Sequence, residues 1–586
     1  MKDFFKQVAA VIVGSLLVSV FTTVMGLIML GAMLASGSQK VALKEGAVLH
    51  LNLNGTIVER AADNPFAEFL GNDMMQEQGL DKILKAIKVA KNNSKVSGIY
   101  IEGGMVNTDF ASLGEIRKAL VDFKESGKFV VAYGENYTQG AYYVASAADK
   151  VMINPSGMLD WHGIASQPIF FKDLLNKLGV KVQVFKVGTY KSAVEPFINT
   201  EMSPANREQV KSFINDIWNV VCTDVAASRQ LTPEILNQYA DNFATFKEPA
   251  EFVKMNMVDT ITYIDGVRDE LRSLAQQEKV NLISPKDLAS YDEVNGAVNS
   301  VAVYYAFGDI VGAESETSLG SSPQIVGPKV VEDLDKLMND ESVKAVVLRI
   351  NSGGGSAFAS EQMWRAIQLL KAKKPVVVSM GGMAASGGYY MSCGANKIFA
   401  EPTTLTGSIG IFGMIPDVSG LLTEKIGLHF DVVKTNEASD FGTMSRGFNA
   451  SESAAMQKYI NRGYELFLTR VAEGRGMTNE AVDKIAQGRV WTGRQAVELK
   501  LVDQLGTLDD AIAEAAQLAQ LDDYTIVSSP AEVMWIDQLS DAVKTDYLEN
   551  KIRAALGVYY EPLRFVQSLE GRDCIQARIP YEPNLN

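Results

Sequence analysis

A serine lies where a predicted buried strand is followed by a predicted helix. The strand is Pro375–Met380, the small-residue segment Gly381–Ala385 follows it, and Ser386 then precedes Gly387 and Gly388. Ligands of α/β sheets bind at strand ends of this kind, and backbone N–H groups at the start of a helix can hold an oxyanion. The pattern suits a nucleophilic serine, although an ordinary helix N-cap would also place a serine here.

Histidine and cysteine are too rare to provide the usual partners of such a serine. The chain of 586 residues has three histidines and three cysteines, no two of them close in sequence: His50, His162, His429, Cys222, Cys393 and Cys574. This spacing excludes an HExxH zinc helix, CxxC redox or zinc pairs and c-type haem attachment, and it leaves little room for a His-based triad. If the chain is a hydrolase, we expect it to work without histidine.

The sequence contains two diverged copies of one domain. Residues 138–164 align without gaps to residues 385–411, and KLGVKVQVFK at 177–186 resembles KIGLHFDVVK at 425–434. Self-similarity at this spacing indicates a tandem duplication of a domain of about 240 residues.

The two copies differ at the residues that could do chemistry. Gln139 stands in the first copy where the second copy has Ser386, which suits the loss of a nucleophile better than a change of helix cap. Conversely, the first copy has Lys191 in the run VGTYKSAVEPF, and the second copy has Ser439 at the same distance. A lone lysine is ordinarily a solvated surface residue, but here each copy has one candidate that the other lacks.

The chain resembles the long, duplicated form of the bacterial signal peptide peptidase family SppA, serine proteases related to the Clp protease and crotonase folds. Three motifs carry the resemblance: MAASGGYY at 383–390, LTGSIG at 405–410 and GTYKSA at 188–193. The resemblance implies that Ser386 is the nucleophile, that Lys191 is the general base, and that Ser408 hydrogen-bonds the lysine amine. It implies no cofactor and no metal.

A lysine must be neutral to accept a proton from a serine. Its ordinary pKa of about 10.4 must therefore fall by several units, and burial between the two copies would do this because desolvation disfavours the ammonium form. For the oxyanion we expect the backbone N–H groups of Gly387 and Gly354, although a tight turn alone would also explain Gly354. Members of the family commonly have proline where Gly353 stands.

Each copy is predicted to be α/β. Short apolar runs alternate with helix-length amphipathic segments, as in Val343–Ile350, Ser360–Leu370 and Pro375–Met380, which is typical of a parallel sheet covered on both faces. The prediction is therefore two tandem ClpP/crotonase-like domains preceded by one transmembrane helix. The expected parts are the N-terminus and anchor (1–45), the first copy with the lysine (46–285), a linker (286–299), the second copy with the serine (300–528) and a C-terminal tail (529–586).

A long apolar segment precedes the first copy. No charged residue occurs from Gln7 to Gln39, and residues 8–35 exceed the ~20 residues that span a bilayer as a helix. A cleaved signal peptide typically has a shorter apolar region of ~7–15 residues, so we expect an uncleaved anchor. The N-terminus would lie in the cytoplasm, and the body on the periplasmic or extracytoplasmic side of a bacterial inner membrane.

Together these features predict a membrane-anchored endopeptidase with a Ser/Lys dyad that degrades cleaved signal peptides. The apolar peptide would bind by strand addition in an apolar groove, and relatives suggest a homotetramer by analogy. The net charge of −15 disfavours nucleic acid as a partner. Two alternatives stay open: a crotonase-like acyl-CoA enzyme, and a non-catalytic membrane scaffold in which the serine and the lysine do not meet.

Overall fold

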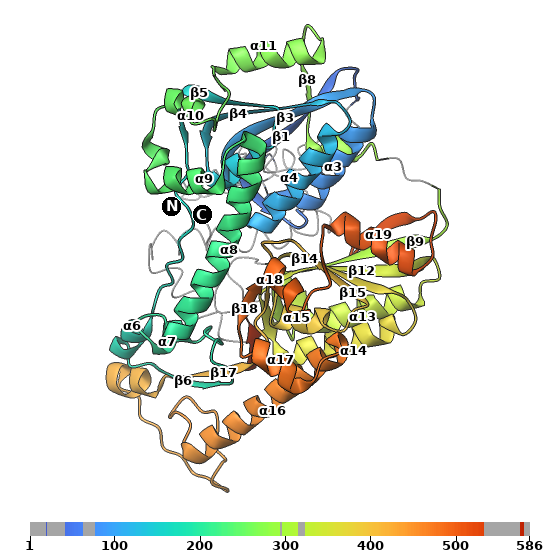
Figure 1. Ribbon diagram of the computed structural model, residues 1–586. Coiled ribbons are helices and arrows are strands. Elements are labelled where there is room, and N and C mark those ends of the chain that lie inside the picture. Colours follow the sequence, from blue (N-terminus) through green and yellow to red (C-terminus); the bar gives the residue numbers. More distant parts are fainter. Residues whose placement is uncertain are drawn as a thin grey trace, which may run out of the picture.

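Two β-sheets, one in each copy, form the framework of the protein (Figure 1). The computed structural model describes residues 19, 21, 42–61, 77–292, 296–313, 323–531 and 575–578. Apart from Ser19 and Phe21, the predicted anchor at residues 8–35 lies outside this part of the chain. Within the described residues, no helix is both long enough and apolar enough to span a bilayer.

The sheet of the first copy is parallel throughout and has the strand order β2-β1-β3-β4-β5-β7, with β8 beside β1. Helices α3, α4 and α5 pack on one face, and α11 packs on the other. Leu49 and Leu51 of β1 therefore join one core while Val48 joins the other, as expected for a strand buried on both faces. The bounds are β1 Ala47–Val58, β2 Glu77–Gly79, α3 Leu80–Asn92, β3 Val96–Asn107, α4 Phe110–Lys124, β4 Phe129–Tyr137, α5 Gln139–Ala145, β5 Lys150–Leu159, β7 Thr260–Ile261, α11 Ile264–Ala275 and β8 Asn281–Ile283.

The second copy repeats this arrangement. Its strand order is β18-β16-β14-β12-β9-β20, with β15 between β14 and β19, and only the β16–β18 pair is antiparallel among the strands described in this sheet. Helices α13, α14 and α15 cover one face and α19 covers the other. The bounds are β9 Ser300–Phe307, α13 Gly327–Asn339, β12 Val343–Ser352, α14 Ala357–Lys371, β14 Val376–Ala385, α15 Gly387–Ser392, β15 Lys397–Ala400, β16 Leu405–Gly407, β18 Val490–Thr492, β19 Gln504–Leu505, α19 Leu508–Leu518 and β20 Thr525–Ser529.

The predicted α/β architecture of both copies is confirmed, with two local differences. The strand predicted at Pro375–Met380 continues to Ala385, because Met383–Ala385 pair with β16. Part of the predicted linker is helical: α12, Pro285–Ala289, packs into the core of the first copy through Leu288 and Ala289. The chain therefore leaves the first copy only after this helix.

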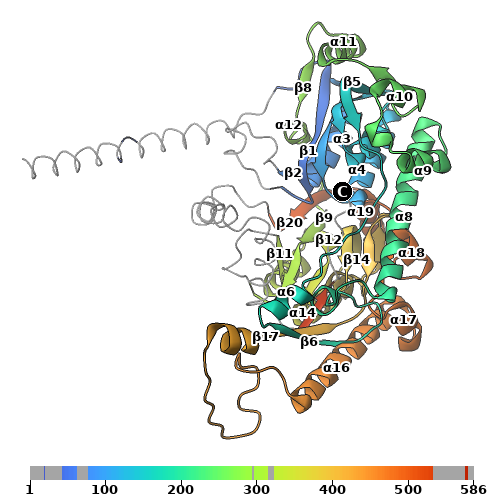
Figure 2. The ribbon, with the colours of Figure 1, turned by 90° about the vertical axis from the view of Figure 1, so that its left-hand side faces the viewer.

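An arm of the first copy, residues 164–203, crosses to the second copy (Figure 2). It contains α6 (Lys172–Lys177), β6 (Lys181–Lys186) and α7 (Glu195–Ile198). Strand β6 pairs antiparallel with β17, Phe412–Asp417, of the second copy. We call residues 164–203 the crossing arm, and it carries Lys191.

The crossing arm belongs to a third, mixed sheet. Its strand order is β11-β10-β13-β21-β17-β6, so strands of the second copy, the crossing arm and the C-terminal tail lie side by side. The bounds of the remaining strands are β10 Asp309–Val311, β11 Gln324–Val326, β13 Gly354–Ser356 and β21 Ile575–Arg578.

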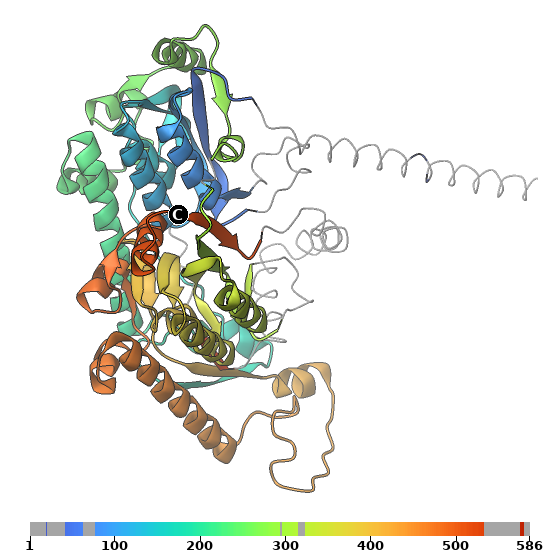
Figure 3. The same ribbon diagram turned by 90° about the vertical axis from the view of Figure 1, so that its right-hand side faces the viewer.

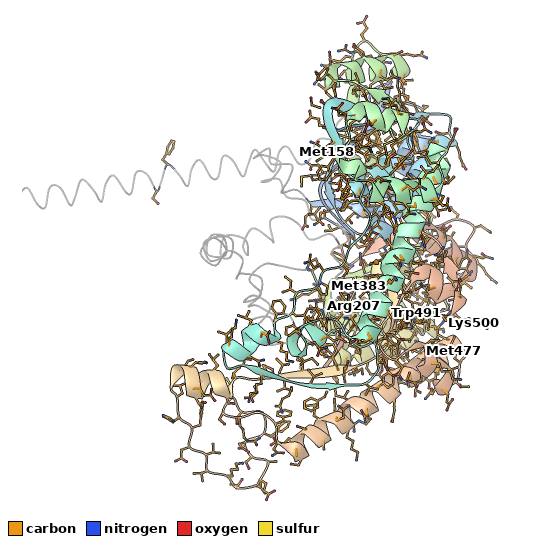
Figure 4. All side chains as sticks on the ribbon, turned by 60° about the vertical axis from the view of Figure 1, so that its left-hand side comes forward. Met158, Arg207, Met383, Met477, Trp491 and Lys500 are labelled. Carbon is orange, nitrogen blue, oxygen red and sulfur yellow. The ribbon has the colours of Figure 1, made fainter. Side chains whose placement is uncertain are left out.

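The long helix α8, Pro204–Arg229, follows the arm and holds the copies together. Figure 4 labels Arg207 on α8 and Trp491 on β18, at the place where this helix passes the second copy. A buried charge cluster adds to the contact, because the Arg349 guanidinium of the second copy lies 2.8 Å from Glu59 and 2.6 Å from Glu115 of the first. The relative position of the two copies is thus set by buried polar contacts as well as by apolar packing.

Candidate active site

Ser386 lies in a strained turn between β14 and α15. Its φ and ψ are 54° and −110°, which a residue with a Cβ rarely adopts. Its backbone N–H donates to the Gly407 carbonyl at 2.8 Å, and its side chain makes no capping hydrogen bond to the helix. Although Ser386 occupies the N-cap position, its hydroxyl is therefore free for another role.

Lys191 meets this hydroxyl from the opposite copy. Its Nζ donates to Ser386 Oγ at 2.8 Å, to the Ser408 carbonyl oxygen at 2.9 Å and to Ser408 Oγ at 3.0 Å. All three side chains are fully buried. Desolvation lowers the pKa of Lys191 well below its ordinary value, as a proton acceptor requires.

Ser408 and Gly488 of the second copy hold the lysine in place. Ser408 has a positive φ of 50°, and its N–H donates to the Arg489 carbonyl at 2.7 Å. Gly488, with φ 77°, lies against the lysine backbone: a Cβ at this glycine would be 2.6 Å from the Lys191 nitrogen. Sequence reasoning missed Gly488, because nothing in the local sequence shows that a residue so distant along the chain packs there.

Buried polar residues of the first copy support the lysine from behind. The Gln209 amide of α8 donates to the Tyr190 carbonyl at 3.0 Å and to Ser192 Oγ at 2.8 Å, and it accepts from the Val490 N–H at 3.2 Å. Gln209 therefore connects both neighbours of Lys191 to the second copy. Asn206 and Glu195 complete the network, with Asn206 Nδ2 donating to Glu195 Oε2 at 3.0 Å. These residues were also missed, and the contact of Gln209 with Val490 forms only because α8 crosses the second copy.

The corresponding turn of the first copy has no such pair. Gln139 accepts hydrogen bonds from the N–H groups of His162 and Gly163 at 3.1 and 3.0 Å, and it donates to the Gly163 carbonyl at 3.2 Å. Thr138, and not Gln139, caps helix α5. The amide side chain is thus bonded within its own copy, at the place that aligns with Ser386.

The two expected oxyanion donors lie next to each other. A Cβ on Gly354, whose φ is 100°, would be 2.7 Å from the Gly387 nitrogen. The N–H of Gly354, however, donates to Ser352 Oγ at 3.1 Å. Gly387 is accordingly the better placed donor of the two.

The histidines stand apart from this centre. His50 Nε2 pairs with Glu102 at 2.7 Å, His162 Nδ1 lies 3.0 Å from Asp160, and His429 lies on an exposed segment of the second copy. Over the described ranges, no group of three or more His, Cys, Asp or Glu side chains is arranged to hold a metal ion.

The fold and the site define a class: an α/β protein with a serine at a strained strand–helix turn and a buried lysine in contact with it. A family model described as Peptidase family S49 matches residues 122–278 and 368–522, one match in each copy, and a model described as Clp protease matches residues 321–405. The chain belongs to peptidase family S49, and it is a serine protease.

Two of the following proteins resemble the chain over most of its length, and the others over part of it. Protease 4 from Salmonella typhi is 38% identical over 544 residues, which cover 87% of this chain and 84% of that protein. The chloroplastic serine protease SPPA of Arabidopsis thaliana is 29% identical over 491 residues, covering 82% and 70%. A putative signal peptide peptidase SppA of Enterococcus faecium is 35% identical over 235 residues, covering 40% and 67%. Among solved structures, a ClpP1 mutant from Listeria monocytogenes matches at 17% identity and a TM-score of 0.23, covering 36% of this chain and 94% of that one.

These findings bear on the two alternatives. The scaffold alternative required Ser386 and Lys191 to lie apart, and the 2.8 Å between Oγ and Nζ contradicts it. The family match favours peptide hydrolysis over acyl-CoA chemistry.

Proposed function

We propose that this protein is a membrane-anchored endopeptidase in which Ser386 and Lys191 form a catalytic dyad that hydrolyses signal peptides left in the membrane after cleavage. The observation that carries the proposal is the 2.8 Å contact between the buried Lys191 amine and the Ser386 hydroxyl, made between the two copies. The name of the Enterococcus relative, a putative signal peptide peptidase, supports the substrate class.

The geometry supports the following sequence of steps. Neutral Lys191 removes the proton from Ser386 Oγ, which attacks the peptide carbonyl and forms a tetrahedral intermediate. The Gly387 N–H stabilises the oxyanion, and the lysine ammonium then gives its proton to the leaving amine, so that an acyl-enzyme forms as the peptide bond breaks. Water, deprotonated by Lys191, hydrolyses the acyl-enzyme and regenerates the serine. Ser408 orients the amine through its carbonyl and hydroxyl oxygens.

Residues 8–35 attach the protein to the bilayer in this proposal. The absence of charge from Gln7 to Gln39 supports a single span with the body on the extracytoplasmic face of a bacterial inner membrane, where cleaved signal peptides remain. Protease digestion of spheroplasts tests the orientation, because a body on the outer face is degraded without lysis.

A head-to-tail homo-oligomer completes the proposal, and the repeat relationship supports it. Within the chain, β6 of the first copy pairs with β17 of the second. The alignments make residues 429–434 the counterpart of β6 and residues 165–170 the counterpart of β17. In the part of the chain that the structure describes, neither counterpart is paired in a sheet.

The unpaired counterparts expose apolar side chains. Figure 3 shows the segment that contains residues 429–434 projecting from the second copy, where Val433 is 97% exposed; on the first copy, Ile169 is 68% exposed. Pairing of residues 429–434 with residues 165–170 of another protomer would repeat the β6–β17 contact between chains. Such a contact joins different surfaces, which gives a ring when the rotation between protomers closes, and we propose a closed ring of four protomers.

Hydrolysis of an apolar signal peptide in detergent micelles tests the dyad. We expect Ser386→Ala and Lys191→Ala each to lower kcat by about 10³-fold or more. Ser439→Ala is the matched control, because Ser439 is the exposed counterpart of Lys191 in the second copy. Full activity of either dyad variant would reject the proposed role of that residue, and hydrolysis of an acyl-CoA thioester but of no peptide would reject the protease function.

A further inference from the structure

The side chain of Arg489 lies between two aromatic rings where the two copies meet. Arg489 directly precedes β18 of the second copy, and its guanidinium carbon is 4.6 Å from the ring centroid of Tyr190 and 4.4 Å from that of Trp491. Tyr190 belongs to the crossing arm and is the neighbour of Lys191, whereas Trp491, labelled in Figure 4, belongs to β18. The guanidinium therefore joins the segment that carries the lysine to a strand of the other copy.

Polar contacts fix the orientation of this guanidinium. Its Nη1 donates to the Tyr190 hydroxyl at 3.0 Å and lies 3.0 Å from Glu208 Oε1 of α8. The Tyr190 hydroxyl in turn donates to the Glu208 carboxylate at 3.4 Å. A planar guanidinium can stack on aromatic rings and donate hydrogen bonds from its edge at the same time, which the compact ammonium of a lysine cannot do. The contacts at this position thus favour arginine over lysine.

The backbone of Arg489 is in contact with the candidate active site as well. Its carbonyl accepts the Ser408 N–H at 2.7 Å, and Ser408 accepts from the Lys191 amine through its carbonyl and hydroxyl oxygens. A Cβ at Gly407 would be 3.0 Å from the same Arg489 carbonyl oxygen, and the Gly407 carbonyl accepts the Ser386 N–H at 2.8 Å. One residue therefore contacts the neighbours of the lysine and of the serine, and Ser408 directly.

We propose that Arg489 is a positioning residue of the protease, whose guanidinium, stacked on Tyr190, holds the lysine segment against the second copy and keeps the Lys191 amine within hydrogen-bond distance of Ser386. Residues 187–194, between β6 and α7, form neither helix nor strand, so the position of the amine depends on contacts of this segment with the second copy. The stack is such a contact and directly adjoins the lysine. This inference rests on the proposed function for the roles of the lysine and the serine.

Replacement of the guanidinium by an ammonium tests this role in the full chain. Arg489→Lys keeps the charge next to Glu208 but loses the stacking on both rings, so we expect kcat for an apolar signal peptide to fall about 10-fold to 100-fold with little change in KM. Arg470→Lys is the matched control, because Arg470 stacks on Trp364 at 3.9 Å and pairs with Glu361 at 2.6 Å, all within the second copy. Equal kcat values for the two variants would overturn the proposal.

Variants of Tyr190 separate the stacking from the hydrogen bond. Tyr190→Leu removes the ring and should lower kcat as much as Arg489→Lys does, whereas Tyr190→Phe keeps the ring and should lower it less. If the two side chains act through one contact, the double variant Tyr190→Leu with Arg489→Lys should be about as active as the less active single variant. Effects that multiply in the double variant would show that Arg489 does not act through Tyr190.

The acid limb of the pH–rate profile is a readout that a loss of stability alone would not move. When the lysine segment is held less firmly, water reaches the Lys191 amine and its pKa rises toward the ordinary value. The midpoint of the limb should therefore move to higher pH in Arg489→Lys and keep the wild-type value in Arg470→Lys. Arg489→Lys conserves the charges on and against the segment, so that the shift reports solvation of the amine; these charges belong to Lys186, Glu195, Glu208 and position 489. An unmoved midpoint would contradict the proposal.

A measurement without catalysis separates this inference from the proposed function. In the Ser386→Ala protein at alkaline pH, acetic anhydride should acetylate Lys191 several times faster when Arg489→Lys is also present, as followed by mass spectrometry, and no faster when Arg470→Lys is present. An unchanged rate of acetylation would overturn the positioning role. If acetylation is faster but the wild type hydrolyses no peptide, the role of Arg489 in holding the lysine stands and the proposed protease mechanism fails.

Discussion

Gly488 of the second copy lies so close to Lys191 of the first that a Cβ at this glycine would be 2.6 Å from the Lys191 nitrogen. The backbone around the lysine is held from the same side, because the Tyr190 N–H donates to the Gln487 carbonyl at 2.9 Å. A lysine side chain has four rotatable bonds and is ordinarily mobile. Its position here is determined by contact between the backbones of the two copies.

Gly488→Ala should therefore displace the lysine. The φ of 77° and the close approach both disfavour a side chain at this position, and we expect kcat to fall about 100-fold. Gly476→Ala is the control: its φ is 62°, and nothing lies within 4 Å of its Cβ position. Gly476→Ala should lose about 1 kcal/mol of stability because of its left-handed backbone, and Gly488→Ala should lose more because its Cβ also meets the Lys191 backbone. Only Gly488→Ala should lose activity in a signal-peptide assay. Equal kcat values for the two variants would contradict the positioning role of Gly488.

The pH dependence of catalysis should report the lowered pKa of Lys191. The base is neutral above its folded pKa, so kcat/KM should be flat at alkaline pH and should fall tenfold per unit once the pH drops below that pKa. Desolvation moves the midpoint of this limb well below the ordinary lysine value of 10.5. A pH–rate profile of the wild type measures it, and a midpoint near the ordinary value would show that the pKa of Lys191 is not lowered.

The same pKa predicts a dependence of stability on pH. Between the folded pKa and the unfolded value near 10.5, the unfolded chain binds one proton more than the folded chain at Lys191. The stability of the wild type relative to Lys191→Met should therefore decrease as the pH falls through this window, by up to about 1.4 kcal/mol per pH unit, and should be constant below it. Urea unfolding of the two proteins between pH 7 and pH 9.5 checks this slope, and a stability difference independent of pH would argue that the buried lysine stays charged.

Gln209→Ala should reduce activity without touching the reacting groups. The variant removes hydrogen bonds to Tyr190, Ser192 and Val490 that hold the lysine segment against the second copy. We expect kcat to fall between about 10-fold and 100-fold with little change in KM. Asn215→Ala is the control, because Asn215 is exposed on the same helix. Similar kinetics for both variants would leave Gln209 without a positioning role.

A charged residue in segment 429–434, the unpaired counterpart of β6, should prevent assembly of protomers. Val433→Glu places a carboxylate in the proposed contact between protomers, so in size-exclusion chromatography with light scattering we expect a monomer for the variant and a tetramer for the wild type. Val298→Glu, at a site 86% exposed outside this segment, is the control and should assemble normally. A tetrameric Val433→Glu protein would place the interface elsewhere.

Loss of Arg349 should destabilise the contact between the copies. Arg349→Met leaves the buried Glu59 and Glu115 carboxyl groups without their guanidinium partner, and we expect a loss of about 3–5 kcal/mol. Lys85→Met breaks an exposed pair with Asp292 and should cost less than about 1 kcal/mol. Thermal or urea unfolding compares the stabilities of the two variants. If Arg349→Met is destabilised as little as Lys85→Met, the charge cluster does not hold the copies together.

The sequence by itself determined the α/β class, the duplication and the candidate residues. Apolar runs of strand length alternate with amphipathic helices, and this pattern can be recognised from neighbouring residues alone. The first copy has Gln139 where the second has Ser386, and the second copy has Ser439 where the first has Lys191. Because each copy could be compared with the other, these differences indicated the two candidate catalytic residues without a structure.

Only the tertiary structure decided how those residues meet. The crossing arm brings Lys191 to Ser386 across 195 positions of sequence, and its burial, which lowers the pKa, exists only when both copies are folded against each other. Gly488 and Gln209 had no local signal, since each acts through a contact with a segment distant in the chain. Helix and strand propensities depend on neighbouring residues and can be predicted from the sequence. Desolvation and close packing depend on which surfaces the fold brings together, and these come from residues far apart in the chain.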